Sequence, residues 1–201
     1  MLEARELQCE RGGRTLFREL SFSVKGGELV RIAGPNGSGK SSLLRILCGL
    51  LAPTAGEVRW QGQKIDALRE EYARQLVYLG HAAGAKDDLT AAENLDFACR
   101  IAGQSASADS IQGALSRLAV PPGPTLRRLS QGQRRRAVLA RLALGEAAPL
   151  WLLDEPFSAL DAGGIELLNV LLQRHLARGG AAAFTTHQDP GVAAARVIEL
   201  G

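Results

Sequence analysis

The segment Gly34-Pro35-Asn36-Gly37-Ser38-Gly39-Lys40-Ser41 is the clearest indication of the fold of this chain. It lies between an apolar run at residues 29–33, which predicts a buried strand, and residues 41–50, whose apolar spacing predicts a helix. In that context the glycines let backbone N–H groups face an anion, Lys40 brings a charge to the β- and γ-phosphates, and Ser41 offers its hydroxyl to Mg²⁺. A plain glycine-rich turn is the alternative, and the complete pattern argues against it. We expect a nucleoside triphosphate to bind at Gly34, Pro35, Asn36, Gly37, Ser38, Gly39, Lys40, Ser41 and Ser42.

Composition limits the class of protein. The chain has 201 residues, of which 46% are hydrophobic, and this size and composition predict one globular domain over residues 1–201. A net charge of +3, spread along the chain, is weak evidence for nucleic acid, and we expect no nucleic-acid partner. No stretch approaches the roughly 18 apolar residues that span a bilayer. If the protein works at a membrane, we expect another chain to supply the spanning helices.

Strands and helices alternate along most of the sequence, which predicts an α/β fold with a mainly parallel core sheet and N-terminal antiparallel strands. A capping-box pattern at Thr90 and Glu93 marks the start of a helix in the middle of the chain. Residues 82–128 are expected to form a helical insertion, and with the next helix the helical subdomain spans about 82–145. The predicted strands are 2–8, 20–24, 29–33, 56–60, 150–153 and 181–185, and the later helices are 111–118, 131–144 and 165–178.

Two acids, Asp154 and Glu155, end the apolar strand at residues 150–153. By itself, such a pair can simply mark the place where a buried strand reaches the solvent-exposed surface. With the glycine loop upstream, we expect Asp154 to hold Mg²⁺ through water and Glu155 to act as the general base for the attacking water.

Three further motifs follow in order, Leu129-Ser130-Gln131-Gly132-Gln133, Ser158-Ala159-Leu160-Asp161 and a late His187. Together with the glycine loop and the acid pair, the ordered set resembles the nucleotide-binding subunit of ATP-binding-cassette (ABC) transporters, over nearly the whole chain. The resemblance implies an ATPase that closes as a homodimer on ATP. Ser130, Gly132 and Gln133 would lie over the ATP of the opposite protomer and Asp161 would couple the two sites. His187 would join Glu155 and Lys40 as a catalytic residue.

Ordinary structural roles compete with two of these assignments. Ser130 also fits a helix N-cap, and the two roles are compatible. A lone histidine such as His187 is often a satisfied, partly buried side chain. His175, in the middle of a predicted helix, has no support for function and is expected at the surface.

Three positions depart from the family pattern. Gln131 replaces the usual glycine. His81, after a strand near position 80, replaces a glutamine that senses Mg²⁺ and the membrane partner. Arg11 stands where an aromatic ring stacks on adenine, and its guanidinium can also stack on a purine.

These departures resemble the ATP-binding subunits of cytochrome c maturation systems, notably in Cys9-Glu10-Arg11, Tyr78-Leu79-Gly80-His81 and the run from Gln131 to Arg136. That resemblance implies a peripheral protein at the cytoplasmic face of the bacterial inner membrane. A membrane-spanning permease would be its partner, and ATP hydrolysis would power a step of haem delivery. A transporter for another cargo stays open. A soluble ABC ATPase acting on nucleic acid is disfavoured, because no heptad run or cysteine cluster separates Ser41 from Leu129.

Overall fold

The computed structural model describes residues 1–80, 84–186, 194 and 196–201. The chain forms two compact units. The first contains Met1–His81, Ala148–Pro156 and His175–Gly201, and the second contains Ala82–Ala147 and Phe157–Arg174. His81 and His187 lie outside the described residues.

The first unit contains an antiparallel sheet with the strand order β2-β1-β4-β5. Its strands are β1 (Leu2–Arg11), β2 (Arg14–Val24), β4 (Ala55–Trp60) and β5 (Gln63–Lys64). Gly12 and Gly13, with φ of 57° and 73°, form the two-residue turn that joins β1 to β2, as a type I′ hairpin requires. This confirms the predicted antiparallel strands at the N-terminus.

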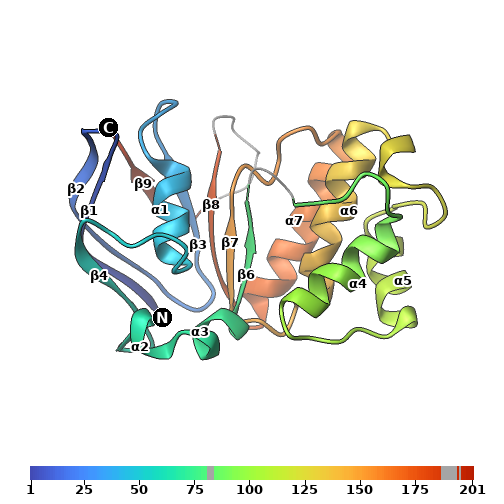
Figure 1. Ribbon diagram of the computed structural model, residues 1–201, viewed down its shortest axis with the longest axis horizontal. Helices are drawn as coiled ribbons and strands as arrows, with labels where there is room; N and C mark the ends of the chain where they lie inside the picture. Colours follow the sequence, from blue (N-terminus) through green and yellow to red (C-terminus); the bar gives the residue numbers. More distant parts are fainter. Residues whose placement is uncertain (81–83, 187–193, 195) are drawn as a thin grey trace. The chain divides into compact units, whose positions relative to one another are not determined.

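The second sheet of the same unit is fully parallel (Figure 1). The glycine loop and the acid pair directly follow the carboxyl ends of two of its strands. Its order is β6-β7-β8-β3-β9. The strands are β6 (Leu76–Leu79), β7 (Leu150–Leu153), β8 (Ala181–Thr185), β3 (Leu29–Ala33) and β9 (Arg196–Glu199). The mixed α/β fold class predicted from the sequence is therefore confirmed.

The core of this unit forms around α1 (Lys40–Leu47). Leu43, Leu44, Ile46 and Leu47 of α1 are buried in one cluster with residues from both sheets. The alternation of β3 puts Val30 and Ile32 into that cluster. Two short helices, α2 (Ile65–Leu68) and α3 (Glu70–Arg74), precede β6.

The second unit is helical. It holds α4 (Ala91–Ile101), α5 (Ala108–Arg117), the short 3₁₀ helix η1 (Leu126–Arg128), α6 (Gln131–Leu144) and most of α7 (Ala162–Ala177). Helices α4, α5 and α6 pack on one another. The capping box at Thr90 and Glu93 is confirmed at the start of α4. No helix among the described residues is both long and apolar enough to cross a bilayer.

The expectation for His175 was wrong. The side chain is 3% exposed, and its ring stacks on Trp151 with centroids 3.9 Å apart and planes 10° apart. Its Nε2 lies 3.1 Å from the carbonyl oxygen of Ala181. The chain can fold back this closely because Gly180 has no side chain, and a Cβ there would lie 2.3 Å from the imidazole ring.

Candidate functional site: a nucleotide cavity beside an acid pair

The glycine loop after β3 depends on glycine where the chain turns most sharply. Gly34, Gly37 and Gly39 have φ of 146°, 82° and 101°, a region that other residues rarely adopt. At Gly34 a Cβ would also lie 2.3 Å from the carbonyl oxygen of Leu200. The predicted loop thus has the backbone conformation that an anion cradle needs.

The lysine of the loop is held across it. Lys40 is 9% exposed, and its Nζ donates to the carbonyl oxygens of Gly34 at 2.7 Å and Pro35 at 2.9 Å. The ammonium group therefore lies inside the loop, where a phosphate would meet it.

Helix α1 starts without a cap of its own. Its N-cap is Gly39, which has no side chain to accept a hydrogen bond, and its first turn contains no acidic residue. The first N–H groups of a helix have no partner within the helix and attract anions. The start of α1 therefore fits a phosphate group.

A cavity of about 580 Å³ opens beside this loop. Residues predicted from two separate motifs line this cavity together, since the glycine loop contributes most of the lining and Glu155 contributes from the acid pair. Sequence reasoning missed Leu16, an apolar side chain from β2. Arg11 is exposed at the end of β1 and is not among the lining residues, so its contact with adenine stays a prediction. The lining is Leu16, Asn36, Gly37, Gly39, Lys40, Ser41, Ser42 and Glu155.

The acid pair is fixed by both neighbouring strands. Asp154 is 2% exposed, and its backbone N–H donates to the carbonyl oxygen of Leu79 at 2.7 Å. The Thr185 hydroxyl donates to Asp154 Oδ1 at 2.6 Å and accepts the Glu155 N–H at 2.9 Å. Sequence reasoning assigned no role to Thr185, although a hydroxyl at the end of the apolar strand β8 was a signal. Burial raises the pKa of the nearby Tyr78 phenol, and the Asp154 carboxylate also raises it.

The predicted signature residues lie in the second unit, at the start of α6. Ser130 caps this helix, since its Oγ accepts the Gln133 N–H at 3.2 Å and Gln133 Oε1 accepts the Ser130 N–H at 3.0 Å. The capping role of Ser130 is thereby confirmed. Gly132 lies against the next motif, because a Cβ there would be 3.4 Å from the carbonyl oxygen of Ala159. Asp161 accepts the Gly164 N–H at 2.8 Å at the start of α7.

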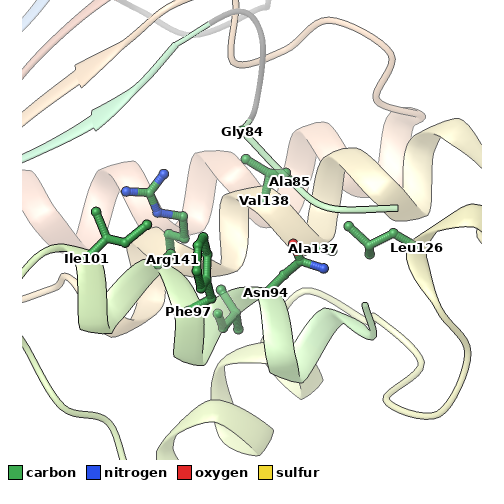
Figure 2. A pocket seen from close by; sticks show the side chains of 11 residues that line it. Gly84, Ala85, Asn94, Phe97, Ile101, Leu126, Ala137, Val138 and Arg141 are labelled. Carbon is green, nitrogen blue, oxygen red and sulfur yellow. The ribbon is translucent and has the colours of Figure 1, made fainter. Parts of the chain in front are cut away.

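A second, smaller cavity lies within the helical unit (Figure 2). It measures about 220 Å³ and is mostly apolar, with Phe97 and Ile101 of α4 and Val138 of α6 in its wall. Lys86 Nζ lies 4.0 Å above the Phe97 ring. The Arg141 guanidinium also lines the cavity, and burial lowers its pKa.

The parallel sheet, the glycine loop and the acid pair define a P-loop nucleotide-binding protein. A family model described as ABC transporter matches residues 17–158. A cytochrome c biogenesis ATP-binding export protein, CcmA, of Aromatoleum aromaticum is 53% identical over 94% of this chain and 89% of its own length. The protein of the same name from Escherichia coli K12 is 46% identical over 100% of this chain and 95% of its own length. A solved dimeric ATP-binding cassette, bound to ADP and Pi after hydrolysis, superposes with a TM-score of 0.83 at 27% identity, covering 100% of this chain and 94% of that one.

The chain belongs to the ABC transporter family and, within it, to the CcmA family. It is accordingly an ATP-binding, ATP-hydrolysing subunit of ABC type.

Proposed function

We propose that this chain hydrolyses ATP to power an export step of cytochrome c biogenesis, the process named for its relatives. The observation that carries the ATPase part is that the glycine loop and Glu155 line one and the same cavity. Lys40 and the uncapped start of α1 offer positive charge and N–H groups to phosphates, and Glu155 offers a carboxylate to water. Binding and hydrolysis of one triphosphate need both.

The roles of the site residues follow from their chemistry. Lys40 and the loop amides bind the β- and γ-phosphates, and Glu155 takes a proton from the attacking water. Ser41 and Asp154 would hold Mg²⁺, Asp154 through water. This pair fits the ion, since Mg²⁺ keeps several waters and needs only one or two protein oxygens. When bound, Mg²⁺ supplies positive charge that offsets the charge on the phosphate oxygens. His187, outside the described residues, orients the γ-phosphate in this proposal.

We also propose that two copies close on ATP as one nucleotide-binding domain each, with the helical part at about 82–145. Ser130, Gly132 and Gln133 would then face the nucleotide of the other copy, and Asp161 would link the two sites. This rests on the start of α6, where Ser130 and Gln131 are exposed. It also rests on the dimeric state of a solved relative.

The carboxylate gives the direct test of the ATPase. Glu155→Gln keeps the shape of the side chain and removes the base, so ATP should still bind while turnover falls at least about 100-fold. Nucleotide binding by fluorescence and phosphate release by a coupled assay measure the two separately. Wild-type turnover in this variant would overturn the assignment of Glu155.

The cavity of the helical unit suits the membrane partner. Phe97 and Ile101 are 36% and 72% exposed and both line this cavity, and an exposed group of apolar side chains is typical of an interaction site. Arg141 is half-buried beside them and has no ion-pair partner among the described residues. We propose that a permease segment with an apolar side chain and a carboxylate binds here, at the cytoplasmic face of the inner membrane, and that His81 helps to transmit its motion.

An affinity pull-down from detergent-solubilised membranes tests the partner and the cargo together. We expect multi-spanning proteins of cytochrome c maturation with the wild type, and none with Ile101→Asp, which places a repelling charge in the apolar cavity. Recovery of a different permease would be consistent with the proposed ATPase activity but would contradict the proposed role in haem delivery. Recovery of nucleic acid without membrane protein would contradict the transporter proposal.

A further inference from the structure

The last residue of β8, Thr185, connects the two acids of the site through one hydroxyl group. Its side chain is fully buried. A hydroxyl has a single hydrogen and two lone pairs. The Glu155 N–H can only donate, so it takes a lone pair of Thr185 Oγ1. The hydroxyl hydrogen is then directed to Asp154 Oδ1, 2.6 Å away.

We infer that Thr185 is a positioning residue of the ATPase site, which holds the Asp154 carboxylate and the Glu155 backbone in one arrangement. The inference rests on the roles proposed above for Asp154 and Glu155. Thr185 acts through these two residues and needs no contact with the nucleotide.

The backbone of Glu155 explains why such a residue is needed. Glu155 has a φ of 49°, in the left-handed region that a non-glycine residue adopts only when its surroundings hold it there. The hydrogen bond to Thr185 is made by the N–H of this same residue. Removal of the hydroxyl would leave the turn that directs the Glu155 side chain into the cavity without this support.

The Asp154 carboxylate is restrained in the same way. Its backbone is tied to β6 through the Leu79 carbonyl, and its side chain is tied to β8 through Thr185. An ion ligand must keep its orientation, and partners that orient ligands typically change metal affinity or activity by about 10- to 100-fold when mutated. Thr185 therefore affects both the proposed cation ligand and the proposed base.

The chain allows a clean test because threonine and valine have nearly the same shape. Thr185→Val removes the hydroxyl and keeps the branched side chain in β8, and Thr185→Ser restores the hydroxyl. Thr54→Val is the matched control, since the Thr54 hydroxyl also accepts a backbone N–H, that of Glu10 at 2.9 Å, but has no role in the site. All variants are full-length, and their unfolding midpoints are recorded.

Two readouts separate positioning from simple stability. Electron paramagnetic resonance of Mn²⁺ with a non-hydrolysable ATP analogue gives cation affinity, and fluorescence in EDTA gives cation-free nucleotide affinity. We expect Thr185→Val to lose about tenfold or more in both Mn²⁺ affinity and kcat. Its nucleotide affinity in EDTA should be unchanged, Thr185→Ser should recover, and Thr54→Val should behave as wild type.

The inference is overturned if Thr185→Val keeps wild-type Mn²⁺ affinity and kcat. It is equally overturned if Thr185→Ser is as impaired as Thr185→Val, or if nucleotide binding in EDTA and the unfolding midpoint fall together. A wild type without ATPase activity would remove the proposed function instead. The Mn²⁺ measurement would still decide the role of Thr185.

Discussion

Helices α1 and α6 begin in opposite ways. Helix α1 starts at Gly39, with φ of 101°, no side-chain cap and no acid in its first turn. Helix α6 starts at Ser130, whose side chain and that of Gln133 close a complete capping box. At both starts the first N–H groups lack a partner within the helix, and both starts have the same partial positive charge. The residues at the first turn decide whether the protein itself or a ligand satisfies them.

Replacement of Lys40 should weaken nucleotide binding at the start of α1 more than any other change. Lys40→Ala removes the cation that lies within the loop of α1 and leaves only amides for the phosphates. Loss of one partner of a buried charge pair costs on the order of 3 kcal/mol, so nucleotide affinity should fall by over about 100-fold. Titration of a fluorescent ATP analogue measures it. Retained affinity would mean that the amides alone hold the phosphates.

An acidic residue in the first turn of α1 should interact with the N–H groups that are otherwise available to a ligand. Ser42→Asp adds a carboxylate at the third helical residue, which the helix favours by about 0.3–1 kcal/mol but which repels phosphate. We expect a slightly higher unfolding midpoint and a loss of ATP affinity on the order of tenfold. Ser42→Asn, which is neutral and of equal size, is the control. Equal binding by both variants would contradict an electrostatic role.

In the absence of nucleotide, the capped start of α6 should respond in stability. Ser130→Ala removes the cap of α6 and should cost about 1 kcal/mol, whereas Ser130→Asp should largely keep it. Urea unfolding of the variants without nucleotide measures this cost. If Ser130→Ala unfolds like the wild type, the cap contributes nothing.

Helix α4 provides the smallest and most specific effect, because its capping box uses Glu93 where α6 uses neutral Gln133. The hydrogen bonds from Thr90, its backbone N–H first, lower the pKa of Glu93 from its ordinary value of 4.5. A lowered pKa in the folded state stabilises above that ordinary value, and the contribution is lost as pH falls through the folded pKa. Stability measured from pH 7 to pH 3 should therefore fall more in wild type than in Glu93→Gln. Parallel curves would rule out Glu93 as the titrating group.

Local signals explain what the sequence could predict. Strands β7 and β8 and helix α6 begin and end at the predicted residues, because uniform apolar runs and a capping box mark their limits. Helix α5 begins three residues before its predicted start, since Ser107 caps it. The glycine loop was predictable because its conformation is encoded within a few consecutive residues.

The remaining features depend on neighbours that are distant in sequence. Strand β9 has charged residues at both ends and, among the described strands, pairs only with β3 at the edge of the sheet, so its short pattern gave no strand signal. Thr185 gains its role from Asp154, which directly follows the adjacent strand β7. Leu16 lines the cavity because the β1–β2 hairpin brings β2 to the glycine loop, which no spacing in the sequence reveals.

The close approach of Gly180 to His175 has a consequence for how the sequence can change. The two positions share one volume, because a single added carbon at 180 would overlap the imidazole ring. Substitutions there cannot be independent: Gly180→Ala should be tolerated only with a smaller residue at 175, and the combined effect of both changes should differ from the sum of the single ones. During divergence, these positions are expected to change as a pair.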